Sequence, residues 1–199
     1  MGNTDNIRKD VNCVDQFIKL KDGRIAFDYF HRYKKGETID ILSLNSLKPD
    51  LTINILNSIK KYIQLKNGDI AIMSDDIRDV PYPFINQGGL IHGIIFISLK
   101  DKTYNIIQKL DCGHAIKKLL EIDDYIYYFT YFDISLIKKA NNKYEIIKKI
   151  SFECGELLDA FYLHNNEVIF QYLKSIAFFD VKEFKYLHKI NLTKTKNKK

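Results

Sequence analysis

Residues 17–27 read FIKLKDGRIAF, and residues 62–72 read YIQLKNGDIAI. Six of the eleven positions are identical, at a spacing of 45 residues. In each copy an apolar segment is followed by a short polar turn and a second apolar segment. The turns, Lys-Asp-Gly and Lys-Asn-Gly, supply residues that tolerate positive φ, which is typical of a tight β-hairpin. The stretch therefore predicts the same hairpin twice.

Weaker copies follow as IKKLLEIDDYIYYF (116–129) and LLDAFYLHNNEVIF (157–170), which we align without gaps. Upstream, LDCGHAI (110–116) aligns with FECGELL (152–158), so the two Cys-Gly pairs occupy equivalent positions in the alignment. The sequence thus contains four related hairpins. Their predicted turns are Asp22-Gly23, Asn67-Gly68, Asp123-Asp124 and Asn165-Asn166.

Each hairpin is followed by a second pair of short apolar segments, so each unit holds about four strands in about 35–50 residues. Apolar stripes at helical spacing are nearly absent. This pattern predicts an all-β fold, a β-propeller-like array of four four-stranded blades. The predicted blades cover residues 15–57, 58–110, 111–150 and 151–190, after an N-terminal extension (1–14) and before a disordered basic tail (191–199).

Recurring apolar positions in these hairpins predict the core between the blades, because each blade buries its faces against its neighbours. The residues expected to be buried are Ile18, Leu20, Ile25, Ile63, Leu65, Ile70, Leu119, Ile126, Phe161 and Ile169.

Two of the units resemble WD40 repeats. Phe179-Asp180 lies where that family carries its Trp-Asp pair, and Gly113-His114 lies where it carries Gly-His. The chain has no Trp, and the other units carry different residues at the Trp-Asp position: Leu42-Ser43, Ile97-Ser98 and Ile137-Lys138. The chain is similar to a degenerate WD40-like propeller. That resemblance implies a scaffold for protein–protein interactions.

Four blades are at the bottom of the range for propellers, so the chain either closes as a small four-bladed ring or forms an open or partial propeller, and we favour the open or partial form. We then expect residues 15–35 and 156–190 to contact a partner chain or to lie exposed as open blade faces, because an unclosed array leaves its end blades half covered. Self-association of two copies, or membership of a longer product, would cover these faces.

The net charge of +6 raises the question of nucleic-acid binding. Only four of the 31 basic residues are Arg, and base recognition and bidentate phosphate binding favour Arg, so the composition argues against this function. The N-terminus has no apolar signal segment, and no segment predicts a transmembrane helix. We therefore expect a cytoplasmic protein that does not bind membranes, with Cys13, Cys112 and Cys154 as reduced thiols.

The loop INQGGLIHG (85–93) is the most ligand-like segment, because Gly88-Gly89 could approach an anion with His92 nearby as an acid or base. A flexible inter-strand connection explains it more simply, since no phosphate-binding motif is present. Asp75, Asp76 and Asp79 could bind a hard cation, but they lack EF-hand spacing and fit a polar turn. The sequence assigns no cofactor or metal.

The five histidines are dispersed, and adjacent strand residues such as Cys112 and His114 rarely form a nucleophile pair. The repeated Cys-Gly favours packing at a blade junction. The aromatic run YIYYFTYFD (125–133) favours core packing, with a recognition surface as the alternative. We assign no catalytic residue. An enzyme would need at least three of the following in one cleft with perturbed pKa values: His31, Asp75, Asp76, His92, Asp133 and His164.

Two functions remain. The sequence favours a non-catalytic interaction scaffold that binds other proteins. The alternative is a ligand-binding or hydrolytic propeller with a polar site near the axis of the blades.

Overall fold

The computed structural model describes residues 14–29, 37–45, 48–55, 58–78, 89–151 and 157–192. Within these ranges every regular element is a β-strand, and the strands form four antiparallel sheets of four strands each. The prediction of an all-β array of four four-stranded blades is confirmed. No helix in the described part of the chain is long and apolar enough to cross a membrane.

Each sheet is a simple meander in which consecutive strands pair, and we refer to the sheets as blades one to four. Blade one contains β1 (Val14–Lys19), β2 (Ile25–Tyr29), β3 (Glu37–Leu42) and β4 (Leu51–Ile55). Blade two contains β5 (Ile59–Gln64), β6 (Ile70–Ser74), β7 (Gly93–Lys100) and β8 (Thr103–Asp111). Blade three contains β9 (Lys118–Ile122), β10 (Tyr125–Phe129), β11 (Asp133–Ala140) and β12 (Lys143–Ser151). Blade four contains β13 (Leu157–Tyr162), β14 (Glu167–Tyr172), β15 (Ser175–Asp180) and β16 (Lys185–Asn191).

The four hairpin turns predicted from the sequence are present, and the predicted turn residues carry the positive φ that the turns require. Gly23 and Gly68 have φ of 87° and 90°, and Asp123 and Asn165 have φ of 54° and 75°. The gap-free alignment of the last two units is wrong by one residue. Ile122 pairs directly with Tyr125 across a two-residue turn, whereas Leu163 donates its N–H to the Glu167 carbonyl across a three-residue turn.

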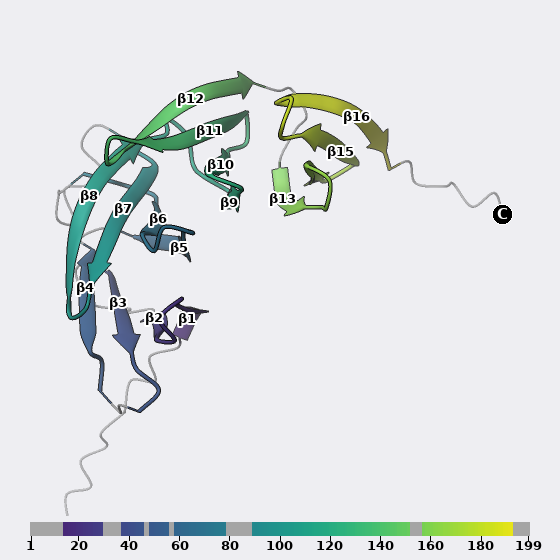
Figure 1. The fold of residues 1–199 in the computed structure, drawn as a ribbon. Coiled ribbons are helices and arrows are strands. Elements are labelled where there is room, and N and C mark those ends of the chain that lie inside the picture. The colour runs from purple at the N-terminus through teal and green to yellow at the C-terminus, as the bar shows by residue number, and fades with distance from the viewer. Residues whose placement is uncertain are drawn as a thin grey trace, which may run out of the picture.

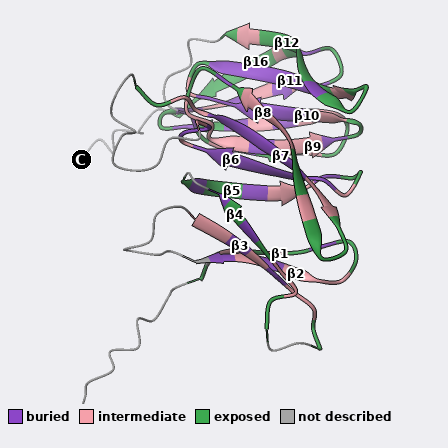
Figure 2. Cartoon of the chain, turned by 90° about the vertical axis from the view of Figure 1, so that its left-hand side faces the viewer, coloured by how far each residue is buried: buried purple, intermediate pink, exposed green. Residues whose placement is uncertain are grey.

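The blades are arranged side by side along an arc, with β1, β5, β9 and β13 on its inner side and β4, β8, β12 and β16 on its outer side (Figure 1). Buried residues concentrate where neighbouring blades meet, and the outer strand β12 is largely exposed (Figure 2). Three apolar clusters fill the three junctions. Ile39 and Ile72 are core residues of the first, Phe96 and Tyr128 of the second, and Phe129 and Phe170 of the third.

Register gives each blade two distinct faces. We call the face that packs on the following blade the leading face, and the opposite face the trailing face. The leading faces of blades one to three carry the cross-strand rows Ile18–Ala26–Ile41, Ile63–Ala71–Phe96 and Leu120–Tyr127–Leu136. The trailing faces of blades two to four carry the apolar pairs Ile70–Ile97, Ile126–Ile137 and Val168–Phe179, all of which are buried.

Most of the predicted core residues are covered. Five of the ten are buried and four are half-buried, but Phe161 is 47% exposed, so its predicted burial is wrong. The reason is its place on the leading face of blade four, which no further blade covers within the described residues. At the hairpin position where blades two and three bury Ile70 and Ile126, the fourth blade buries Val168 rather than the predicted Ile169.

Blades one and four lie at opposite ends of the arc and do not meet (Figure 1). Phe17 on the first blade is 73% exposed, and Phe161 on the fourth is 47% exposed. The expectation of open end faces at these two segments is therefore confirmed for the described residues. Residues 30–36 and 156 of those segments lie outside the described part of the chain.

Candidate interaction rim

The hairpin turns of successive blades lie along one edge of the arc, because in a four-stranded meander the first and third turns fall at the same end of the strands. We call this edge the turn rim. It is formed by residues 20–24, 65–69, 101–102, 123–124, 141–142, 164–166 and 181–184.

A repeated backbone contact connects the rim across the first two junctions. The N–H of Lys21 donates to Gln64 Oε1 on the next blade at 2.7 Å, and the N–H of Lys66 donates to both carboxylate oxygens of Glu121 at 2.7 and 2.9 Å. The ammonium groups repeat as well: Lys21 Nζ donates to the Lys66 carbonyl, and Lys66 Nζ donates to the Asp123 carbonyl. The repeated Lys thus positions each turn against the next.

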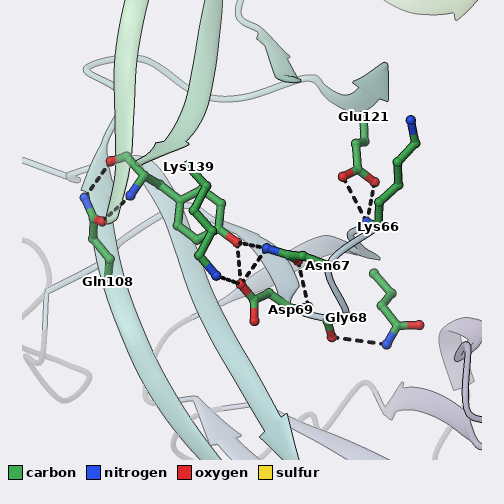
Figure 3. A network of polar contacts seen from close by, with 9 residues as sticks. Lys66, Asn67, Gly68, Asp69, Gln108, Glu121 and Lys139 are labelled. Atoms are coloured by element: carbon green, nitrogen blue, oxygen red, sulfur yellow. Dashed lines mark hydrogen bonds and ion pairs between the residues drawn. The ribbon is translucent and has the colours of Figure 1, made fainter. Parts of the chain in front are cut away.

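A denser polar network lies at the junction of blades two and three (Figure 3). Asp69 Oδ2 accepts hydrogen bonds from Tyr144 Oη at 2.5 Å and from Asn67 Nδ2 at 3.0 Å, and it pairs with Lys139 Nζ at 2.6 Å. Asn67 Oδ1 in turn accepts the backbone N–H of Asp69 at 3.0 Å, which closes the turn around Gly68. A carboxylate from one blade therefore holds two side chains of the next.

Tyr144 is fixed on every side. Its ring stacks on Phe96 with centroids 3.7 Å apart, and its backbone N–H and carbonyl pair with the Gln108 side-chain amide at 2.8 and 2.9 Å. Burial is the main cause that raises the pKa of Tyr144, and the hydrogen bond to Asp69 raises it further. Tyr144 therefore acts as a neutral hydrogen-bond donor across the physiological range.

The junction of blades three and four uses other contacts. Tyr127 Oη donates to the Val181 carbonyl at 3.1 Å, and Lys148 Nζ lies 5.6 Å from the centroid of the Phe184 ring. Lys118 Nζ pairs with Asp159 Oδ1 at 2.9 Å. The pKa of Asp159 is below its ordinary value: burial raises it, but the hydrogen bonds from Lys118 and the Ala160 N–H lower it more.

A shallow depression lies on the rim at each of these junctions, with volumes of about 480, 540 and 450 Å³ from the first junction to the third. Each is lined by side chains of two adjacent blades. Lysines and carboxylates lie together in the first two, for example Lys100 with Asp101, and Lys138 with Glu121. The third combines Lys182 with Tyr125 and other aromatic side chains. The rim thus offers three adjacent contact points of mixed charge.

Among the sequence-predicted acid and histidine candidates that the structure describes, Asp75 and His92 contact each other away from the turn rim. Asp75 Oδ1 lies 3.5 Å from His92 Nδ1, and Asp75 also pairs with Lys60. Asp76 forms a bidentate pair with Arg78, whose hydrogen bonds hold the pKa of that carboxyl below its ordinary value. The three depressions are lined by none of the six candidate residues.

Asp133 belongs to a separate cluster at the start of β11. Burial alone would raise its pKa, but hydrogen bonds from Ser151 at 2.6 Å and from Lys149 at 3.0 Å lower the pKa below its ordinary value. His31 and Asp79 lie outside the described residues, as do Ile85–Gly88 of the glycine-containing loop. The described residues contain no group of three His, Cys, Asp or Glu side chains that could hold a metal ion.

The cysteine and aromatic patterns serve packing where the structure describes them. Cys112 is buried in the cluster between blades two and three, and burial raises the pKa of its thiol to about 12. Cys13 and Cys154 lie outside the described residues. In the aromatic run, residues 126–130 are buried and Phe132 is 57% exposed, so the run forms mainly core.

The Asp69 network was missed by sequence reasoning. The sequence predicts only a turn at Asn67-Gly68, and Tyr144 lies 75 residues after Asp69 along the chain. One signal in the sequence could have indicated the junction contacts. Lys recurs at positions 21 and 66 of the repeat; Gln64 lies 43 residues after Lys21, and Glu121 lies 55 residues after Lys66.

The fold and the rim define the chain as an open, propeller-type array of four blades. Neither a protein-family model nor a curated protein sequence matches it. Solved structures of propeller folds match the chain. The chain is similar to the dihydro-heme d1 dehydrogenase NirN in complex with DHE, with a TM-score of 0.60 and 12% identity over 92% of this chain and 38% of that chain.

Two further structures are similar to the chain. The C-terminal WD40 domain of Sif2 gives a TM-score of 0.54 and 13% identity over 90% of this chain and 58% of that one. The AfRom2 CNH domain gives a TM-score of 0.52 and 11% identity over 85% of this chain and 52% of that one. The chain thus spans less than two thirds of each of the three structures. At these identities the likeness shows the propeller fold alone.

Proposed function

We propose that the chain is a non-catalytic scaffold that binds other proteins through the turn rim. The observation that supports this most directly is the row of three depressions at successive blade junctions, each lined by two blades. A protein surface or an extended segment that follows the rim can contact several of them at once. The resemblance to WD40 repeats supports the same function by analogy.

The side chains on the rim suit such a role. Lys100, Lys138 and Lys182 are exposed, one beside each depression, while the buried polar groups beneath them are occupied with contacts between blades. Exposed lysines give a partner with surface carboxylates a basis for recognition, and such charge pairs act mainly on specificity and association rate. We infer a partner whose contact surface carries acidic residues.

The test compares two charge-reversal variants in quantitative co-purification followed by mass spectrometry. The rim variant is Lys100→Glu with Lys138→Glu, and the control is Lys174→Glu with Lys189→Glu, which makes the same change in net charge away from the rim. We expect proteins retained by the wild type and by the control to be lost from the rim variant. Equal retention by both variants would contradict the proposal.

The alternative is a ligand-binding propeller. One observation on this chain favours it, the depression of about 540 Å³ beside the Asp69, Tyr144 and Lys139 network. The similar NirN structure is itself a complex with DHE, which supports the alternative by analogy. Under this alternative, a small molecule should raise the melting temperature of the wild type but not that of Lys138→Glu. Protein partners that depend on the rim would instead support the scaffold.

A further inference from the structure

The leading face of blade four repeats the apolar row that the other three blades pack against the blade that follows. Its row is Phe161–Ile169–Phe178, in register with the rows of blades one to three, and the Phe178 ring stacks on His188 with centroids 4.2 Å apart. Ile169 and Phe178 are half-buried. Phe161 is 47% exposed and Ile190, on the same face, is 49% exposed. This face is therefore built like a blade junction, but no second blade covers it within the part of the chain that the structure describes.

The trailing face of blade one is its counterpart. Its row is Lys19–Ile25–Leu42, at the positions that blades two and three occupy with Gln64–Ile70–Ile97 and Glu121–Ile126–Ile137. Ile25 and Leu42 are half-buried, whereas the equivalent residues of the other blades are buried. Phe17, on the same face, is 73% exposed.

The two end faces are of opposite kinds, and at each of the three junctions within the chain a leading face packs on a trailing face. The chain has one open face of each kind, at the two ends of the arc (Figure 1). A second copy supplies both missing faces at once. Two copies related by a two-fold axis along the centre of the arc would form a closed ring. If the rotation between successive copies did not return to the first copy, the same contact would give a filament.

We propose that two copies of this chain associate head to tail, with the leading face of blade four in each copy packed on the trailing face of blade one in the other, to close one ring. The size of the similar structures agrees with this. The chain spans 52% of the AfRom2 CNH domain and 58% of the Sif2 WD40 domain, so a second copy would supply about the share of each of these two domains that one copy does not cover; of the NirN chain it spans 38%.

Charge complementarity supports the same pairing. Lys19 occupies the position of Gln64 and Glu121, whose side chains contact the turn of the preceding blade. In the ring Lys19 faces the turn of blade four, where Glu167 and Asp180 lie opposite each other on the leading face. A cation thus takes the place of the two acceptors and faces a pair of carboxylates on the preceding blade.

The experiment measures the mass of the full chain by sedimentation from about 0.1 to about 100 µM, the range in which weak and moderate dimers dissociate. We expect a discrete species of twice 23.4 kDa at the upper end. Phe161→Glu and Phe17→Glu should each give monomers, because each blocks both contacts of the ring. The control Phe132→Glu changes an exposed Phe in the β10–β11 turn and should remain dimeric.

The other outcomes are decisive. A wild-type monomer over the whole range, or larger polymers in place of a dimer, would overturn the closed ring. A dimer abolished by Phe161→Glu but not by Phe17→Glu would indicate two fourth blades in contact and would also overturn it. The proposed rim function is tested separately by the lysine variants, so the two can fail independently.

A second pair of variants covers the case in which a Phe→Glu change unfolds the chain. Lys19→Glu should weaken dimerisation about tenfold or more, and Glu167→Lys should do the same, whereas the double variant should recover most of the loss. Far-ultraviolet circular dichroism of each variant checks that the sheets are intact. Additive weakening in the double variant would contradict the pairing of these two faces.

Discussion

Asp69 is a buried carboxylate that adds polar contacts to the apolar junction between the second and third blades. Its side chain accepts hydrogen bonds from Asn67 and Tyr144 and pairs with Lys139, two of which belong to the neighbouring blade. Because Tyr144 is 1% exposed, water cannot readily replace the carboxylate as its partner. Removal of Asp69 therefore leaves a buried hydroxyl and a partly buried ammonium without their acceptor.

We predict that Asp69→Ala lowers the free energy of unfolding by about 1–3 kcal/mol, the cost of leaving a buried polar group unsatisfied. Urea-induced unfolding followed by circular dichroism measures this change. The matched control is Glu183→Ala, an exposed acidic residue in the turn after β15, which should change the free energy by less than about 0.5 kcal/mol. Equal effects of the two substitutions would show that the network is not stabilising.

Asp76 gives a prediction for pH dependence. The hydrogen bonds from Arg78 hold its pKa in the folded chain below its ordinary value of 3.8. A carboxyl with a depressed pKa in the folded state contributes stability that is fully present above 3.8 and is lost as the pH falls through the lower folded value.

Asp76→Asn should therefore make the free energy of unfolding less dependent on pH below about pH 4, while the remaining paired carboxylates keep part of the slope. Urea unfolding at several pH values between about 2 and about 7 measures this dependence. Asp124→Asn, a change in an exposed turn carboxylate, should retain the wild-type slope. An unchanged slope in Asp76→Asn would contradict the assignment.

Sequence reasoning succeeded at residues whose role is local. Gly23 and Gly68 follow from turn chemistry alone, and both have the expected positive φ. It failed at Asp69 and Tyr144, because their contact joins residues that only the packing of two blades brings together. The exposure of Phe161 was missed for a related reason: its apolar character marks a junction face, but burial depends on whether another blade follows.

At the scale of the elements, the irregularities of the strands recur. The outer strand pairs of blades two, three and four each shift register at the same place, before Ile97, Ile137 and Phe179. A bulge increases local twist and bends the strand, which fits the curved outer strands β8, β12 and β16 in Figure 1. The apolar alternation predicted the strands, but it contains no signal for the extra residue in each bulge.

Gly93 begins β7 at a crowded point of blade two. A Cβ at this position would overlap the Leu110 carbonyl oxygen and lie 2.8 Å from a methyl group of Ile77. The turn residue Gly68 is different, since nothing lies near a Cβ there and its φ of +90° is the constraint. The two glycines therefore serve close approach and turn geometry respectively.

We predict that Gly93→Ala lowers the free energy of unfolding by about 3 kcal/mol through steric overlap, and that Gly68→Ala lowers it by about 1 kcal/mol through backbone strain. Chemical denaturation of both variants measures the difference, with each serving as the reference for the other. If Gly68→Ala were the more destabilising, the overlap at Gly93 would be relieved by movement of β8.

At the scale of the whole molecule, the repeat predicted the blade architecture and the open ends, because both follow from the number of similar units. The contacts that hold the blades together could not be predicted in the same way. The first two junctions share the repeated Lys contact, but the third uses Tyr127 and Lys118 instead. Junctions in such an array are near-independent interfaces, so their chemistry can diverge while the fold is kept.

The arrangement of blades in a row predicts a gradient of local stability. Blades two and three are covered on both faces, whereas blades one and four are each covered on one, so the end blades should open at a lower free energy. Hydrogen exchange measured by mass spectrometry on the dilute chain should show faster exchange in β2 and β15 than in β6 and β11. At concentrations where two copies associate, exchange in β2 and β15 should slow, while the Phe161→Glu variant should retain the dilute pattern. Equal exchange in end and central blades of the dilute chain would contradict the gradient, and would indicate that the end faces are already covered within one copy.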